Sequence, residues 1–380
     1  MSAEQVFTNA RLVLEDRVVY GTLVVRDARI AAVEDGRSHL PAAHDLEGDT
    51  VIAGLVELHT DNLERHLTPR PGVRWPSLAA LISHDAQLAA AGITTVFDAV
   101  TVGTAIDGGE RSSILGEAIQ AIHQATAEQE LRADHFIHLR CEVSDPGLRA
   151  LWETLRDDPF IRLVSLMDHT PGQRQFVDEE KFRAYYRGKH RLSDAEIDAL
   201  IERSREGQAR HALPSRLEIA AYHRARGTPL ASHDDATVAH IDEAAALGCA
   251  IAEFPTTLEA AGAARRSGLG TIMGAPNLVR GGSHSGNIAT ASLAEAGLLD
   301  MLSSDYVPVS LLHGAFLLQT ACGLGLDAAI ATVTATPARM AGLDDRGRLA
   351  PGLRADFVRV RLHEDRVVPR ETWCGAQRVA

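Results

Sequence analysis

Short apolar runs separated by amphipathic stretches fill the middle of the chain. Helix-like patterns, such as residues 78–92 and 195–204, lie between several of the runs, and Ser193 with Glu196 predicts a capping box at the start of the second one. Apolar runs that alternate with helices are typical of parallel strands joined by crossovers, so eight of them predict an α/β fold, a (β/α)8 TIM-type barrel. The runs span residues 51–61, 93–100, 136–143, 161–170, 229–235, 249–257, 271–277 and 301–307.

The two ends of the chain follow a different pattern. Apolar and polar positions alternate around Asn9, Gly21 and Gly36 near the N-terminus, and the C-terminal residues return to this strand-and-turn style. Two β-rich ends that enclose a βα middle predict one small β-sandwich domain formed by both termini. The expected domains are 1–52 with 345–380 for the sandwich and 53–344 for the barrel.

Polar residues end nearly every predicted strand. In a parallel barrel the carboxyl ends of the strands meet at one mouth, where the chemistry of this architecture takes place. One acid or imidazole there is commonly a helix cap or a hydrogen-bonded structural residue. A full set at one mouth is different, because crowded like charges are costly unless a cation neutralises them. The strand-end candidates are His59, Asp61, Asn62, Asp98, Glu142, Asp168, His169, His233, Asp234, Asp235, Glu253, Asn277 and Asp305.

This set predicts a divalent metal centre, because mixed imidazole and carboxylate ligands suit zinc, manganese or iron. His59 and Asp61 are two positions apart on one strand, so both side chains can reach one ion. Asp305 could also accept a proton from a metal-activated water. The alternative is that these residues only cap and crosslink the barrel. The expected ligands are His59, Asp61 and Asp305 for one ion, His169 and His233 for the other, and Glu142 as a bridge.

Composition and charge limit the kinds of molecule that the protein is expected to bind and the compartment in which it is expected. The chain of 380 residues is 45% hydrophobic and 23% charged, as in ordinary soluble proteins, and it has no apolar run long enough to cross a membrane. The N-terminus lacks the pattern of a signal peptide, and four scattered cysteines show no disulfide or metal spacing, so we expect a cytoplasmic protein. A net charge of −13 argues against nucleic acid and anionic membranes. An anionic substrate would then need a local basic site.

Several motifs together resemble the amidohydrolase superfamily. They are the H-x-D of residues 59–61 after a glycine-led apolar strand, the strand-end histidines, Asp305, and the tail T-A-T-P-A-R…G-R-L-A-P-G-L-R-A-D-F-V within 334–358. The resemblance covers the whole chain and implies a metal-bearing (β/α)8 barrel with a small β-sandwich from both termini. It also implies a hydrolase, with two zinc ions as the first expectation and manganese or iron as alternatives.

The chain departs from the superfamily pattern in two places. Asp61 stands where a second histidine is usual, and the usual bridging carboxylated lysine cannot form, because Lys181 and Lys189 are the only lysines and lie far from any strand end. A glutamate must then bridge, and Glu142 is the best placed. The superfamily takes the histidines of the second ion from strands five and six, whereas His169 and His233 follow predicted strands four and five. Either the strand count slips by one or Glu253 participates.

A narrower resemblance is to the diphosphatases of the carbon–phosphorus lyase pathway. It rests on residues 59–76, 84–99, 166–176, 231–235 and 274–287, which include HTDNLERH, LMDHTPGQRQF and GAPNLVRGGSHSGN. It implies hydrolysis of α-D-ribose 1-methylphosphonate 5-triphosphate to the 5-phosphate and pyrophosphate in phosphonate metabolism. The partner would be this small polyphosphorylated ribose, and a homodimer is left open.

A polyphosphate needs cationic groups and backbone N–H groups aimed at its oxygens. The segment after strand seven places basic and polar side chains around paired glycines, although a mobile loop with a helix cap is the alternative. The basic insertion after strand four could act as a lid, with a solvent-exposed charged helix as the alternative. The expected substrate-binding residues are Asn62, Arg70, Gln173, Arg174, Arg280, Ser283, His284 and Asn287.

Two other functions compete with this one. The same metal centre could hydrolyse a C–N bond in a deacetylase or a cyclic amidase, which assays with N-acyl substrates would reveal. A metal-free barrel could instead serve as a scaffolding subunit, and metal analysis of the purified protein separates that case from both enzymes.

Overall fold

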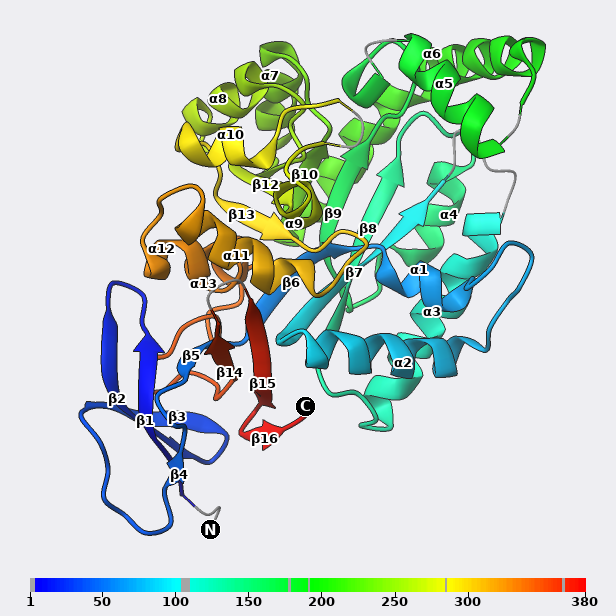
Figure 1. Ribbon diagram of the computed structural model, residues 1–380. Coiled ribbons are helices and arrows are strands. Elements are labelled where there is room, and N and C mark those ends of the chain that lie inside the picture. The colour runs from blue at the N-terminus through cyan, green and yellow to red at the C-terminus, as the bar shows by residue number, and fades with distance from the viewer. Residues whose placement is uncertain (1–3, 104–109, 177–178, 191, 284–285, 364–365) are drawn as a thin grey trace.

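Two sheets organise the molecule (Figure 1). The computed structural model describes residues 4–103, 110–176, 179–190, 192–283, 286–363 and 366–380. Within these residues one eight-stranded sheet runs in the order β13-β12-β11-β10-β9-β8-β7-β6, and all its pairs are parallel. The strands are β6 (Leu55–Thr60), β7 (Ile93–Val102), β8 (Asp134–Glu142), β9 (Ile161–Met167), β10 (Leu230–His233), β11 (Ile251–Glu253), β12 (Gly270–Gly274) and β13 (Met301–Ser303).

The parallel sheet closes on itself at its first and last strands. Thr60, at the end of β6, forms a parallel bridge with Asp305, just after β13. The backbone N–H of Asp61 donates to the Asp305 carbonyl at 2.9 Å, and that of Asp305 donates to the His59 carbonyl at 3.1 Å. The predicted (β/α)8 barrel is therefore confirmed.

Helices alternate with the barrel strands and surround them (Figure 1). The predicted capping box is confirmed, because Ser193 and Glu196 bond reciprocally at the start of α6. The helices are α1 (Asn62–Leu67), α2 (Ser77–Ala90), α3 (Glu110–Ala127), α4 (Leu148–Leu155), the 3-10 turn η1 (Arg174–Phe176), α5 (Glu179–His190), α6 (Asp194–Ala225), α7 (Val238–Leu247), α8 (Leu258–Arg266), α9 (Ala275–Val279), α10 (Thr290–Glu295), α11 (Ser310–Thr320), α12 (Leu326–Ala331) and α13 (Ala335–Met340).

The barrel strands bury apolar side chains on both faces, as parallel strands between helices must. Inside the barrel, Phe97, Leu163 and Ile272 belong to one cluster, which also includes Ala338 of α13 and Ala341 just after that helix. A larger cluster joins the outer faces of the strands to the surrounding helices. The filled interior leaves the carboxyl ends of the strands as the place where polar groups gather.

The second sheet combines both ends of the chain. It runs β16-β15-β14-β5-β1-β2-β3, with β4 pairing to β1, so blue and red segments lie together in Figure 1. Gly54 separates β5 from β6, and a Cβ there would lie 2.2 Å from Thr94 Oγ1, so the close approach of the two sheets requires glycine. The domain boundaries at 52 and 345 remain a prediction. The strands are β1 (Gln5–Val13), β2 (Val18–Arg26), β3 (Arg29–Asp35), β4 (His44–Asp45), β5 (Thr50–Ala53), β14 (Phe357–Leu362), β15 (Val367–Cys374) and β16 (Gln377–Arg378).

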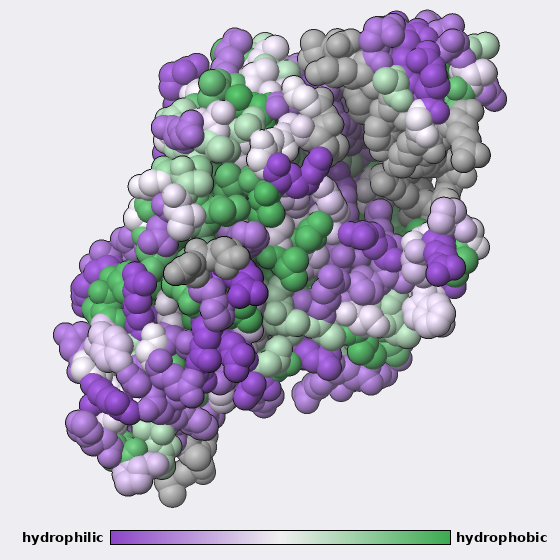
Figure 2. Space-filling view, viewed as in Figure 1, coloured by the Kyte–Doolittle hydropathy of each residue, from purple (hydrophilic) through white to green (hydrophobic). Residues whose placement is uncertain are grey.

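The basic insertion after β9 forms the pair of helices α5 and α6. Both lysines lie on α5, so neither is on a barrel strand. Hydrophilic residues gather over the outer end of this helix pair (Figure 2). None of the helices in the described ranges combines the length and apolar character that a membrane span requires.

Candidate metal centre

A first group of potential ligands lies where the barrel closes. His59, Asp61 and Asp305 each offer a ligand atom within 4.8 Å of the others, and His59 Nε2 is 3.8 Å from Asp61 Oδ1. Asp61 follows β6 and precedes α1, while Asp305 follows β13 in the left-handed region, with φ 53°. Burial, and secondarily the Asp61 carboxylate, raise the pKa of Asp305 to about 6. The structure thus brings together the three residues that the sequence assigned to one ion.

A second group lies at the ends of β9 and β10. His169 Nε2 and His233 Nε2 are 3.8 and 3.5 Å from Asp234 Oδ2. His233 is the last residue of β10, and Asp234 follows it with φ 55°, a conformation that is uncommon outside glycine. His169 and His233 were expected to share an ion. Asp234 was a strand-end candidate but not an expected ligand.

The Glu253 carboxylate contacts one histidine of each group. Its Oε1 lies 3.1 Å from His59 Nδ1, and its Oε2 lies 3.1 Å from His233 Nδ1. A histidine that donates Nδ1–H to a carboxylate keeps its Nε2 lone pair free for a metal, and the carboxylate fixes the ring orientation. Glu253 is 1% exposed at the end of β11. Its buried carboxylate therefore contacts His59 in the first group and His233 in the second.

The position of Glu253 resolves the strand count. His169 and His233 follow the fourth and fifth barrel strands, and Glu253 ends the sixth, so the count does not slip. The alternative of a slipped strand count is thereby removed, and a ligand role for Glu253 remains a prediction. In its contacts, the carboxylate faces the Nδ1 atoms rather than the Nε2 side of the rings.

Arg140 balances the acid that stands in place of a second histidine. Its Nη1 donates to Asp61 Oδ1 at 2.9 Å, and its side chain is 10% exposed. His138, Arg140 and Glu142 alternate along β8, while Leu139 and Cys141 between them join the outer core. The guanidinium therefore comes from the barrel wall and not from a loop.

Glu142 contacts the second group through His169. Its Oε2 lies 2.6 Å from His169 Nδ1, and its Oε1 accepts hydrogen bonds from Ser144 Oγ at 2.7 Å and from the His169 backbone N–H at 3.2 Å. Glu142 thus holds His169 as Glu253 holds His233. Its bridging role between two ions remains a prediction.

Asp98 does not face the mouth, so that expectation is wrong. β7 continues to Val102, and the Asp98 side chain points to the helix side, 2.8 Å from His84 Nε2 and 2.7 Å from His135 Nδ1. Although burial opposes it, the charge of Asp98 helps raise the pKa of His135 to about 9. The Asn62 side chain also points to the helix side, where its Nδ2 donates to His84 Nδ1 and to Gln87 Oε1, both at 2.9 Å.

The residues expected to bind substrate differ in their exposure and contacts. Arg70 and Arg280 are exposed, and Gln173 is half-buried. Ser283 Oγ accepts from the backbone N–H of Asn287 within the loop after α9. His284 lies outside the described residues. Arg174 is 4% exposed and already paired with acidic side chains, which places it in the protein framework.

Sequence reasoning did not single out Asp234 or Arg140, and it left Glu253 as an open alternative. Asp234 was visible as a strand-end acid, but nothing in the pattern separated it from its neighbours. Arg140 had a signal that went unused, because it sits between His138 and Glu142 with the two-residue period of one strand face. Its contact with Asp61 required the fold.

The two groups fit divalent metal ions. Each combines imidazole nitrogen with carboxylate oxygen, and the Nδ1 atoms of all three histidines face carboxylates. After burial, the Asp61 carboxylate helps raise the pKa of Asp305, and a cation between the two would relieve this repulsion. Two other groups of metal-capable side chains in the described part of the chain, around His84 and around His138, are occupied by internal hydrogen bonds.

Known proteins match both the sequence and the fold. Residues 85–380 match the model of the amidohydrolase family. The chain is 48% identical over 376 residues to the alpha-D-ribose 1-methylphosphonate 5-triphosphate diphosphatase of Escherichia coli (strain K12), which covers 98% of this chain and 100% of that protein. Both resemblances noted in the sequence are confirmed.

Solved structures share the architecture at low identity. The N-isopropylammelide isopropylaminohydrolase of Burkholderia multivorans ATCC 17616 is 18% identical, with a TM-score of 0.65 over 100% of this chain and 98% of that one. The N-acetyl-D-glucosamine-6-phosphate deacetylase of Mycobacterium smegmatis is also 18% identical, with a TM-score of 0.65 over 99% and 100%. These likenesses show the fold alone, whereas the family match and the full-length relative place the chain in the amidohydrolase family.

Proposed function

We propose that this chain hydrolyses α-D-ribose 1-methylphosphonate 5-triphosphate to the 5-phosphate and pyrophosphate. The observation that carries the proposal is the 48% identity, over the whole length, to an enzyme with that name. The two ligand groups at the barrel mouth supply the chemistry that such a reaction needs. The four cysteines are free, which suits a reducing cytoplasm.

Two divalent ions are part of the proposal, zinc first and manganese or iron as alternatives. His59, Asp61 and Asp305 would hold one ion, and His169, His233 and Asp234 the other. Bound ions of this kind polarise phosphoryl oxygens and lower the pKa of water toward neutrality. Glu253 and Glu142 keep the histidine Nε2 atoms available by accepting hydrogen bonds from Nδ1.

The reaction is an in-line displacement at the α-phosphorus. The water oxygen forms a bond to that phosphorus while the bond from phosphorus to the α–β bridging oxygen breaks, and pyrophosphate departs. Asp305 accepts the proton of the attacking water, because burial gives its carboxyl a higher proton affinity than an exposed aspartate has. Arg140 is fixed beside Asp61 and supplies positive charge next to the developing negative charge.

The pyrophosphate end of the substrate needs further donors. Arg70, Gln173, Arg280, Ser283 and Asn287 remain the candidates. Glycine-rich segments after the seventh strand of such barrels often supply backbone N–H groups to phosphate. Arg174 is not a candidate for binding pyrophosphate, because its guanidinium is already paired with Asp235 and Glu243.

Product analysis tests the proposal, by phosphorus NMR for the triphosphates and by proton NMR for the amides. The purified chain is incubated with the ribose triphosphate, with ATP, and separately with N-acyl sugar and cyclic amide substrates. We expect pyrophosphate and the 5-phosphate from the ribose triphosphate and no amide cleavage. Amide cleavage without pyrophosphate would instead assign the chain to the C–N hydrolases.

A further inference from the structure

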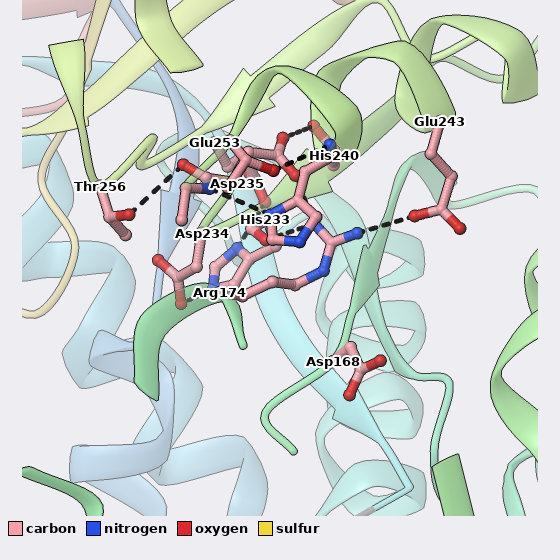
Figure 3. Close-up of polar contacts among 12 residues, drawn as sticks. Asp168, Arg174, His233, Asp234, Asp235, His240, Glu243, Glu253 and Thr256 are labelled. Carbon is pink, nitrogen blue, oxygen red and sulfur yellow. Dashed lines mark hydrogen bonds and ion pairs between the residues drawn. The ribbon is translucent and has the colours of Figure 1, made fainter. Parts of the chain in front are cut away.

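A row of alternating charges lies beside the second ligand group. Arg174 pairs with Asp235 through Nη1, and its Nη2 lies 2.9 Å from Glu243 Oε2 (Figure 3). Arg216 Nη1 lies 3.3 Å from the other oxygen of Glu243, and Arg216 Nη2 lies 2.8 Å from Asp168 Oδ2. We call the row Asp235–Arg174–Glu243–Arg216–Asp168 the charge ladder. It joins η1, α6 and α7 to the ends of two barrel strands.

Both ends of the charge ladder adjoin the second group in sequence. Asp235 directly follows His233 and Asp234, and Asp168 directly precedes His169. Asp235 and Asp168 are themselves buried, with 0% and 2% exposure. The ladder therefore ties together the two chain segments whose relative position sets the spacing of the three ligand atoms.

Arg174 also reaches the backbone that carries the ligands. Its Nη1 donates to the carbonyl of His233 at 3.2 Å. Arg174 and Asp234 both have positive φ, 50° and 55°, which costs free energy for residues other than glycine and persists where surrounding contacts fix it. The Asp234 backbone N–H is fixed from the other side by the Glu253 carbonyl at 2.8 Å.

The chemistry of guanidinium suits this place. A planar fork can satisfy two acids and a carbonyl at once, which an ammonium group on a flexible stem cannot do. Truncating one partner of such a buried network leaves uncompensated charge, so the neighbouring acids must move or take up protons. Either response would displace the strand ends that adjoin the ladder.

We propose that the charge ladder positions His169, His233 and Asp234 for the second metal ion, chiefly through Arg174, which also bonds the His233 carbonyl. Arg174 is then a positioning residue and not a phosphate contact. The inference rests on the proposed function in one respect, since it takes over the assignment of an ion to the second group.

Metal titration without substrate tests this inference. The affinity of each ion is measured by chelator competition in the wild-type chain, Arg174→Gln and Arg174→Lys, and His233→Gln identifies the step that belongs to the second group. We expect Arg174→Gln to weaken the second ion about 10- to 100-fold and to leave the first unchanged. The affinity of Arg174→Lys for the second ion should lie between those of the wild-type chain and Arg174→Gln. The lysine variant replaces the glutamine variant if the latter fails to fold.

A matched control is Arg346→Gln. Arg346 is also buried and ion-paired, with Asp134 and Asp345, but Asp134 begins β8 at the opposite end of the barrel. Its loss should lower stability and leave both metal affinities unchanged.

Three results would overturn the inference. Unchanged metal affinities with a raised KM for the triphosphate would make Arg174 a phosphate contact. Equal weakening of both ions would show a general structural role, and a wild-type chain that binds no second ion would remove the site. The titration involves no turnover, so a selective loss of the second ion upholds the inference even if the triphosphate proves not to be the substrate.

Discussion

Arg140 and Asp61 form a charge-assisted hydrogen bond at the mouth of the barrel, with Nη1 2.9 Å from Oδ1. The pair explains how the first ligand group tolerates an aspartate beside His59 and Asp305. The extra negative charge is compensated inside the barrel wall, by a residue of β8, before any substrate arrives. The centre is therefore less anionic than its acidic ligands alone suggest.

Removing the Arg140 guanidinium should impair catalysis more than metal binding. We expect Arg140→Gln to lower kcat/KM by about 100-fold, because a fixed cation next to the developing phosphoryl charge is lost. Steady-state kinetics together with metal analysis measure both effects. Arg162→Gln is the control, since Arg162 is exposed on β9 and lies over the Phe136 ring. Unchanged kinetics in Arg140→Gln would show that the guanidinium serves the fold alone.

Asp305 should be needed for proton transfer. Asp305→Asn keeps an oxygen that can contact an ion but cannot take a proton at neutral pH. We expect turnover to fall by about 100- to 10,000-fold while metal content stays nearly intact. Metal content is determined on the same preparation as the rate. Full activity in this variant would rule out Asp305 as the general base.

Glu253 should matter for both ions, unlike Arg174. A glutamine there can accept a hydrogen bond from one histidine Nδ1–H, but its NH₂ group opposes the other. We therefore expect Glu253→Gln to weaken both ions, each by about 10- to 100-fold, in chelator competition. Glu259→Gln, on the exposed side of α8, should change neither affinity. If only one ion weakens, Glu253 does not orient both histidines.

The buried pair of His135 and Asp98 should make stability depend on pH. The pKa of His135 is raised from 6.5 to about 9, so the protonated ring stabilises the fold below about pH 6.5, and this contribution is lost as pH rises toward about 9. One pKa unit corresponds to about 1.4 kcal/mol, so the loss amounts to a few kcal/mol.

The apparent Tm of the chain and of His135→Gln, measured across this pH range, isolates the effect. The wild-type Tm should fall toward that of the variant as pH rises. Parallel curves for the two proteins would mean that His135 does not titrate in this window.

The sequence predicted the architecture because its signals are local. Each of the eight apolar runs, and each alternating stretch at the β-rich termini, reflects the burial pattern of a single strand. Ser193 with Glu196 marks a helix start within four residues. The first ligand group was also predictable, since His59 and Asp61 are two residues apart where one strand ends and Asp305 closely follows another.

The rest of the site depended on contacts between distant segments. Asp98 was misplaced because β7 runs four residues beyond it to Val102, and the direction of a side chain follows the strand face and not the end of an apolar run. Arg174 was assigned to phosphate because sequence shows its charge but not its partners. Asp235 and Glu243, which pair with it, lie more than sixty residues further along the chain.

The position of the broken bond decides whether the chain is a diphosphatase that acts at the α-phosphorus. The ribose triphosphate is hydrolysed in water enriched in oxygen-18, and phosphorus NMR locates the label through its isotope shift. Attack at the α-phosphorus predicts unlabelled pyrophosphate and one labelled oxygen on the ribose 5-phosphate. Label in the pyrophosphate, release of single phosphates, or no turnover with metal-replete protein would contradict the account.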